Sequence, residues 1–159
     1  MSGAGYKKAQ SFLERLATKL GHGGMLEVGF LAGATYSGTH PTRGGKTFKG
    51  PVAQVAFWNE FGAPKAGIPA RPFMRTAVEQ NSPEWAPRMA YIAKAVNYDT
   101  KKILTNMGIM IAEQIRTSLN EWTSPPNSPR TIAIKGFDKP LQDTAHMKRS
   151  IDYAVLMTP

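Results

Sequence analysis

A stripe of apolar residues between residues 100 and 122 constrains the fold of this chain more than any other segment. Every fourth position in it is a large aliphatic residue: Ile103, Met107, Ile111, Ile115 and Leu119. This spacing places all five side chains along one side of an α-helix, drifting slowly around its axis. The proline-rich run at residues 124–129 ends the helix and is expected to form an exposed connection. We therefore expect one long helix at about 100–122 whose apolar side organises a core.

Shorter apolar patterns predict further helices. Residues 6–20 form an amphipathic pattern that ends at Gly21, since glycine readily closes a helix. Residues 52–62 are apolar nearly all round, which indicates a helix that is buried on more than one side or shared with a partner. Pro72 fits the first position of another helix. A separate helix is expected to start at the Ser82-Pro83 pair or, alternatively, with Pro87 in its first turn. A short helix is expected around residues 141–149.

Two segments alternate between apolar and polar positions and are predicted to be strands. Residues 26–30 form the first and residues 151–157 the second, and the two can pair with each other. Residues 33–51 are rich in Gly, Thr, Lys and Arg and are expected to form a long, mobile loop or an extended hairpin. The predicted fold class is α+β, a small antiparallel sheet covered by helices, in a single domain of residues 1–159.

The composition excludes several classes of protein. A chain of 159 residues suits one hydrophobic core. The absence of cysteine excludes disulfides, thiolate zinc sites and a cysteine nucleophile. No apolar run approaches the roughly 18–20 residues of a membrane helix, so we expect a soluble protein with no membrane partner.

No motif in the sequence predicts catalysis. The three histidines, His22, His40 and His146, lie far apart and have no neighbours at metal-ligand spacing. Residues 40–47 approach a phosphate-binding loop, but His40 replaces its first glycine and Pro51 prevents a following helix. We therefore expect no catalytic residues, no cofactor and no metal, which means a protein that is not an enzyme.

The net charge of +9 raises the question of a polyanionic partner. The excess is +5 in residues 1–50, +1 in 51–100 and +3 in 101–159, so it is spread thinly along the chain. A small basic nucleic-acid-binding protein is therefore kept as the alternative function. It would use basic residues from the first third of the chain on phosphates: Lys7, Lys8, Arg43, Lys46 and Lys49.

Aromatic residues divide into two groups. Phe57, Phe61, Phe73 and Trp85 fall on apolar sides of predicted helices and are expected in the core. Trp58 lies off the main apolar stripe, beside Asn59 and Glu60, and suits a protein interface.

Two blocks of the sequence resemble a known family. Residues 57–81 contain Asn-Glu-Phe-Gly at 59–62, followed by Ala-Arg-Pro-Phe-Met-Arg at 70–75. This pattern resembles the signature of the head-to-tail joining and tail-completion proteins of tailed bacteriophages, the virion morphogenesis or minor-tail-protein-Z-like family. Residues 139–155 are similar to the closing pattern of that family, Pro-Leu then Asp-Thr-Gly. Here Asp143 and Thr144 match that pattern, whereas Ala145 stands where the family usually has glycine.

Elementary chemistry gives the first block a physical role. Gly62 permits a backbone turn, and Glu60 is expected to accept hydrogen bonds from N–H groups of that turn or from Arg71. Pro72 fixes φ at a helix start, while Phe73 anchors the helix in the core. A turn-building role and an interface role both stay open for the motif residues, which are Trp58, Asn59, Glu60, Phe61, Gly62, Arg71, Pro72, Phe73, Arg75, Asp143 and Thr144.

The resemblance implies a structural virion protein at the phage neck or upper tail, made in the cytoplasm of the host bacterium. It would form a cyclic ring of copies, with six as the candidate number, and would join head to tail or complete the tail tube. The implied partners are connector, stopper or portal-side proteins, the tail tube protein, and genomic DNA passing through without sequence specificity. The 33–51 segment would reach the neighbouring ring or the DNA through Arg43, Lys46 and Lys49, becoming ordered on assembly.

Overall fold

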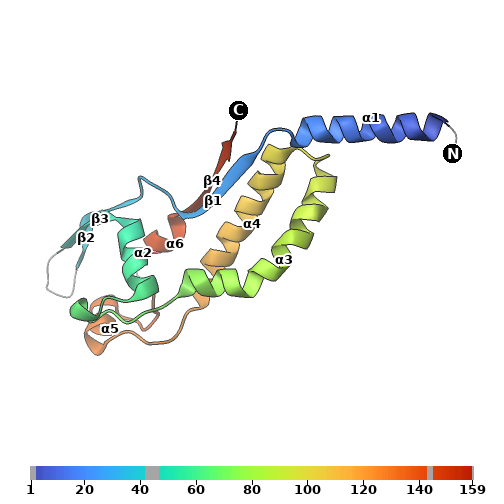
Figure 1. Ribbon diagram of the computed structural model, residues 1–159. Helices are drawn as coiled ribbons and strands as arrows, with labels where there is room; N and C mark the ends of the chain where they lie inside the picture. The colour runs from blue at the N-terminus through green and yellow to red at the C-terminus, as the bar shows by residue number, and fades with distance from the viewer. Residues whose placement is uncertain (1–2, 42–46, 143–144, 159) are drawn as a thin grey trace.

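The computed structural model describes residues 3–41, 47–142 and 145–158, and Figure 1 shows an elongated molecule. Helix α1 (Gly3–Leu20) projects from one end, and the hairpin of β2 (Thr35–Pro41) and β3 (Thr47–Pro51) lies at the other. Between them, helices α3 (Phe73–Ala95) and α4 (Thr100–Glu121) run beside a two-stranded sheet. The chain has the predicted α+β fold, a small antiparallel β region with helices.

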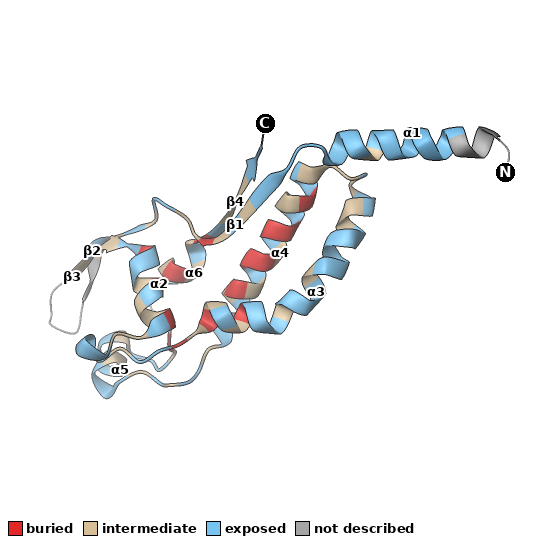
Figure 2. Ribbon diagram, in the orientation of Figure 1, coloured by how far each residue is buried: buried red, intermediate tan, exposed pale blue. Residues whose placement is uncertain are grey.

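Helix α4 is the centre of the core. Its start is fixed by Asp99, whose side chain accepts a hydrogen bond of 3.0 Å from the Lys102 backbone N–H. All five residues of the predicted stripe are buried, together with Gly108 and Ala112. Figure 2 shows these buried positions along the length of the helix. The prediction of one long helix that organises the core is confirmed.

The main sheet consists of β1 (Gly24–Phe30) and β4 (Ile151–Met157), paired antiparallel as predicted. Side chains on one face, such as Leu26 and Tyr153, pack against α4. Glycine is needed at position 108 of α4, because a Cβ atom there would lie 2.5 Å from Cδ2 of Tyr153. The close contact between helix and sheet therefore depends on this missing side chain.

The segment at 33–51, predicted to be either a mobile loop or an extended hairpin, contains the antiparallel hairpin of β2 and β3. The Tyr36 and Phe48 rings meet edge to face across it, with their centroids 6.0 Å apart. Its base is joined to α2 (Val52–Phe61) by a hydrogen bond of 2.9 Å from the Val52 N–H to the Ala34 carbonyl. Residues 42–46, with Arg43 and Lys46, lie outside the described residues.

One continuous helix, α3, replaces the two that were predicted from Pro72 and Ser82-Pro83. Pro72 is its N-cap, and Pro83 and Pro87 lie inside it. Proline removes a backbone hydrogen bond from the helix interior and forces the chain aside, so a helix can continue through it only with a bend. Figure 1 shows α3 changing direction along its length. The prolines bend this helix without ending it.

The last third of the chain departs from prediction in two short helices. Helix α5 (Pro129–Lys135), which was not predicted, begins with the Ser128 side chain accepting from the Thr131 N–H and ends at Gly136 in the left-handed conformation. Helix α6 spans only His146–Arg149, shorter than the helix expected around 141–149. Leu141 and Ala145 both have positive φ, at 61° and 58°, which excludes them from a right-handed helix.

Candidate functional site

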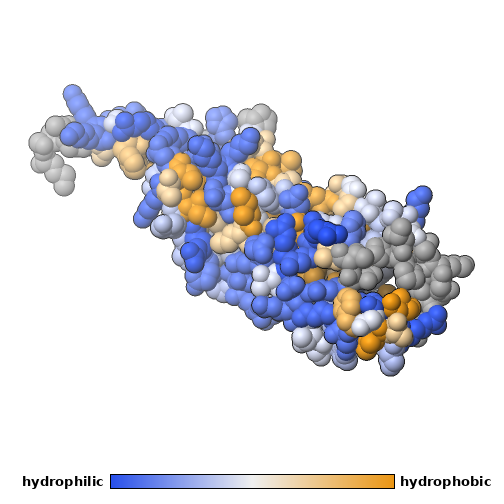
Figure 3. Space-filling model, turned by 180° about the vertical axis from the view of Figure 1, so that it is seen from behind, coloured by the Kyte–Doolittle hydropathy of each residue, from blue (hydrophilic) through white to orange (hydrophobic). Residues whose placement is uncertain are grey.

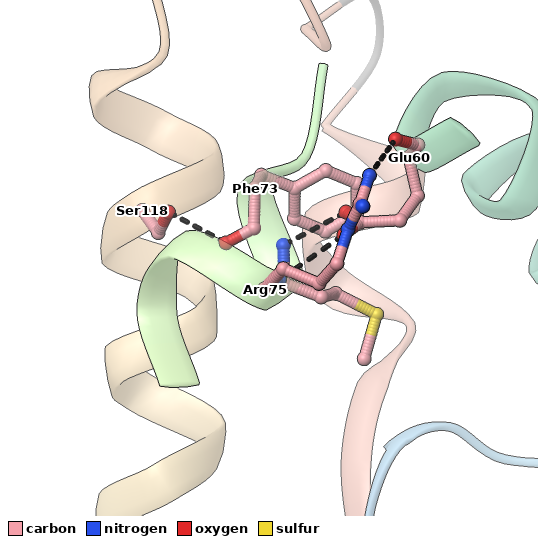
Figure 4. Close-up of polar contacts among 5 residues, drawn as sticks. Glu60, Phe73, Arg75 and Ser118 are labelled. Atoms are coloured by element: carbon pink, nitrogen blue, oxygen red, sulfur yellow. Dashed lines mark hydrogen bonds and ion pairs between the residues drawn. The ribbon is translucent and has the colours of Figure 1, made fainter. Parts of the chain in front are cut away.

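Glu60, the next-to-last residue of α2, joins the two halves of the first motif block. Its carboxylate is buried and accepts hydrogen bonds from the backbone N–H groups of Met74 (2.9 Å) and Arg75 (3.1 Å). Those groups belong to the first turn of α3, where N–H groups have no partner within the helix. Figure 4 shows this arrangement. Glu60 therefore caps a helix that begins more than ten residues after it in the chain.

Arg75 closes the same contact from the outside. Its Nε atom lies 3.0 Å from Oε1 of Glu60, and its Nη2 atom donates to the Glu60 backbone carbonyl at 3.0 Å. The guanidinium carbon also lies 4.8 Å from the centre of the Phe61 ring. Because the Arg75 side chain is 59% exposed, water screens the ion pair and limits its contribution to stability.

Arg71 forms a second buried contact, separate from Glu60. Its Nε and Nη2 atoms donate to the backbone carbonyls of Pro125 and Pro126, each at 3.1 Å, and its Nη1 atom reaches Oδ1 of Asn59 at 3.4 Å. Burial lowers the pKa of Arg71, partly offset by the nearby Asp138 carboxylate. The backbone N–H of Arg71 also donates to the Asn59 carbonyl at 2.6 Å.

Of the two alternatives expected for Glu60, backbone N–H groups or Arg71, the pairing with Arg71 is wrong, and Glu60 binds backbone N–H groups at the start of α3. Glu60 lies where the free N–H groups of the first turn of α3 point, and those groups take both carboxylate oxygens. Arg71 precedes that turn, and its side chain extends instead to the proline-rich 124–129 segment. We call the set of contacts made by Asn59, Glu60, Arg71 and Arg75 the motif clasp.

Gly62 and Phe73 complete the support of the motif clasp. Gly62 has φ of +79°, and a Cβ atom there would lie 3.0 Å from the backbone nitrogen of Ala70. Both observations explain why glycine follows α2. Phe73 is fully buried, as predicted, and meets the Phe30 ring edge to face. The Ser118 hydroxyl donates to the Phe73 carbonyl at 2.7 Å and so ties the start of α3 to α4.

The aromatic residues of α2 are arranged differently from the prediction. Phe57 and Phe61, expected in the core, are 59% and 53% exposed, and their ring centroids lie 4.7 Å apart. The buried side of α2 carries Val52, Ala56 and Glu60. Periodicity alone could not choose between these two sides. The side that contains a carboxylate is buried because Glu60 finds hydrogen-bond donors there.

The other predicted aromatic residues have partners within the chain. Trp58 is half-buried, and its ring meets Phe48 of the hairpin edge to face at 5.6 Å. This contact gives Trp58 a structural role within the chain. Its role at an interface with another protein stays a prediction. Trp85 is half-buried and donates through Nε1 to Oε1 of Gln114 at 2.9 Å.

The second motif block is described only in part, since Asp143 and Thr144 lie outside the described residues. The next residue, Ala145, adopts the left-handed conformation that suits the glycine of the resembled family. His146 then contacts the hairpin, with its Nε2 atom 3.1 Å from the Thr35 carbonyl and its ring 4.9 Å from Tyr36. Lys49, the described member of the three loop residues, is exposed on β3.

The chemistry of the motif clasp is that of a structural joint. Its buried carboxylate binds backbone N–H groups at the start of α3, and its buried guanidinium binds backbone carbonyls of the proline-rich segment, so it joins α2, α3 and that segment. Sequence reasoning missed the role of Arg75, the carbonyls of Pro125 and Pro126, and Ser118, because each depends on contacts between distant segments. Within residues 3–41, 47–142 and 145–158, no group of three or more His, Asp or Glu is placed to hold a metal ion. Nor is any helix of this part long and apolar enough to cross a membrane.

Comparisons of the chain with protein-family models, with curated proteins and with solved structures find no match.

Proposed function

We propose that this chain is a structural virion protein of the neck or upper tail of a tailed bacteriophage. In this proposal it acts without catalysis, by forming a ring of copies that joins head to tail or completes the tail tube. The similarity of the two motif blocks to the tail-completion family supports the phage assignment. The surface of the molecule supports an assembly role.

The amount of surface is the observation that carries the proposal. The chain exposes 10328 Å², whereas a compact monomer of its mass should expose about 7,900 Å². The excess of roughly 2,400 Å² exceeds what two standard interfaces would cover, at about 800 Å² for each partner. A protein that contacts one neighbour on each side has a use for such surface.

The chemical character of this surface agrees with burial by partners. Among the described residues, fourteen large hydrophobic side chains are exposed, against twelve buried hydrophobic residues. Figure 3 shows apolar side chains gathered at both ends of the face in view, next to the α1 arm and at the opposite end. Exposed apolar patches that are rimmed by polar residues are typical of protein interaction sites.

Deleting the coding sequence from the phage that carries it tests the proposal. We expect filled heads and tails to accumulate as separate particles, with joining restored when the protein is supplied from a plasmid. Electron microscopy of intact particles should locate the chain between head and tail. Normal particles without the chain would contradict the proposal.

A DNA-binding assay separates the proposal from the alternative of a basic nucleic-acid-binding protein. An assembly protein should bind naked DNA weakly at physiological salt. Tight binding that weakens steeply as salt is added, with unchanged virion assembly after deletion, would favour the alternative.

A further inference from the structure

Helix α1 presents an apolar side that the rest of the described chain covers only in part, at Leu16. Phe12, Leu13 and Leu20 are 49%, 60% and 48% exposed, and Leu16 is half-buried. Figure 2 shows the helix exposed over almost its whole described length. An isolated helix of this size is marginally stable in water, and packing of its apolar side normally supplies most of its stability.

The base of α1 is attached in a way that directs the helix away from the body. The Lys19 side chain donates to the Asn97 carbonyl at 3.1 Å, and the Thr100 hydroxyl donates to the Lys19 carbonyl at 3.2 Å. The first contact is with the connection between α3 and α4, and the second is with the first residue of α4. Figure 1 shows α1 projecting from that point, away from β1 and β4.

In the described part of the chain, no helix lies over the second face of the sheet of β1 and β4. Side chains alternate along a strand, so the residues next in sequence to those that face α4 lie on the opposite side. There Met25 pairs with Leu156, and both are about half exposed, at 53% and 48%. We call this side, with Met25, Glu27, Asp152, Ala154 and Leu156, the outer sheet face.

Charge and size match α1 to the outer sheet face. The only charged residues of the two strands are Glu27 and Asp152, and both lie on this face, in a chain of net charge +9. Helix α1 carries the opposite sign, with Lys7, Lys8, Arg15 and Lys19 against one acidic residue, Glu14. An 18-residue helix is about 27 Å long and a seven-residue strand about 24 Å.

We propose that the apolar side of α1 packs on the outer sheet face of a second copy of this chain. The arm and the sheet face are two different surfaces, so copies joined head to tail through them make a heterologous contact, in which each copy supplies one arm and receives one from another neighbour. Such a contact closes into a ring when the rotation between copies divides a full turn. This inference rests on the proposed self-assembly and names the surfaces that carry it.

Disulfide cross-linking tests the contact, because the chain contains no cysteine. The variant carries Leu13→Cys with Leu156→Cys, one on each surface, and is oxidised both in concentrated solution and in purified particles. We expect multimers on a non-reducing gel that disappear on reduction. The matched control carries Thr18→Cys, on the polar side of α1, with Leu156→Cys, and should give several-fold less multimer.

A charge-swap pair provides a second measurement that does not depend on disulfide geometry. The side chain of Asp152 is exposed, so Asp152→Lys should leave folding intact. It should weaken self-association by roughly tenfold. Arg15→Glu in the same chain should restore part of the lost association, and it leaves the Lys19 contact at the base of α1 in place. The concentration dependence of sedimentation measures both effects.

The outcomes separate this contact from the proposed function. A disulfide within one chain, or no cross-link while the wild-type chain still forms oligomers, would overturn the arm contact alone. Equal cross-linking by the Thr18 control would do the same. A chain that stays monomeric at every concentration and is missing from particles would overturn both proposals.

Discussion

At the scale of single residues, the buried carboxylate of Glu60 accepts hydrogen bonds from several groups at once. Glu60 satisfies two backbone N–H groups at the start of α3 and also binds the Arg75 side chain. Negative charge near the N-terminus of a helix is favourable because the unpaired N–H groups carry partial positive charge. The stability of the α2–α3 joint should therefore depend on Glu60 more than on any other polar residue of the motif clasp.

Substitution of Glu60 separates this capping role from the surface ion pair. Glu60→Gln places an amide donor against backbone donors and should lower the free energy of unfolding by about 1–3 kcal/mol. Arg75→Ala, which removes only the exposed partner, should cost at most about 1 kcal/mol. Urea unfolding followed by circular dichroism measures both. Equal losses for the two variants would show that the ion pair, and not the cap, stabilises the joint.

Ala145 gives a second prediction at this scale. Its left-handed backbone should cost about 1–2 kcal/mol for a residue with a Cβ atom. Ala145→Gly removes this strain but adds freedom to the unfolded chain, so we expect a net gain of about 0.5–1 kcal/mol in thermal or urea unfolding.

Gly136 allows the opposite substitution to be tested, glycine to alanine at a position of positive φ. It has φ of +79° and nothing within 4 Å of its missing Cβ atom, so its only constraint is conformational. Gly136→Ala should destabilise the protein by about 1 kcal/mol. If both substitutions leave stability unchanged, backbone strain at positive φ does not govern this part of the chain.

At the scale of elements, the sequence predicts what local patterns determine and fails where distant contacts decide. Helix α4 is predicted well because its stripe is long and periodic, and β1 and β4 are predicted by alternation. Helix α5 was missed although Ser128-Pro129 and Gly136 mark its start and end, because seven residues are too few to show a helical repeat of apolar positions. The burial of Glu60 in place of Phe57 and Phe61 could not be predicted, since donors on α3 decide it.

The N-cap of α4 gives a prediction about pH. The pKa of Asp99 is lowered, chiefly by the hydrogen bond from the Lys102 backbone N–H, despite some opposition from desolvation. A group with a lowered pKa in the folded state stabilises it above the unfolded pKa, about 3.9 for Asp, and loses that effect as pH falls through the folded value. We therefore expect Asp99→Asn, a neutral cap, to lose less stability than the wild type below about pH 4.

Thermal unfolding between neutral and acidic pH measures this difference. The melting temperatures of wild type and Asp99→Asn should converge as the pH falls. Lys102→Met serves as the control, because it keeps the backbone donor and should retain most of the wild-type pH dependence. Parallel curves for wild type and Asp99→Asn at all pH values would contradict the assignment.

At the scale of the whole molecule, exposed aromatic residues lie beside a rigid joint. Phe57 and Phe61 contact each other at the surface of α2, and Arg75 of the motif clasp packs on Phe61. Side chains held in fixed positions lose little entropy when a partner covers them, which favours binding. This pair is therefore a candidate for contact with a neighbouring protein, in addition to the α1 arm.

Replacing both phenylalanines by serine tests this patch. Because both side chains are exposed, the unfolding temperature should change little, while the number of joined particles should fall at least tenfold in complementation of a deletion phage. Tyr91→Ser, which removes an exposed aromatic residue from the far half of α3, is the control and should complement normally. Full activity of the Phe57 and Phe61 double variant would exclude the patch from assembly.

The bend in α3 has a mechanical consequence for the molecule as a whole. Glu60 and Ser118 bind the first turn of α3. The connection that follows the last turn of α3 contains Asn97, whose carbonyl accepts a hydrogen bond from Lys19 at the base of α1. One helix thus connects the joint at one end to the arm at the other, with Pro83 and Pro87 between them. Missing backbone hydrogen bonds make that stretch more compliant than the rest of the helix. If tail and head pull on opposite ends of this protein, the stretch at Pro83–Pro87 is where it should flex first.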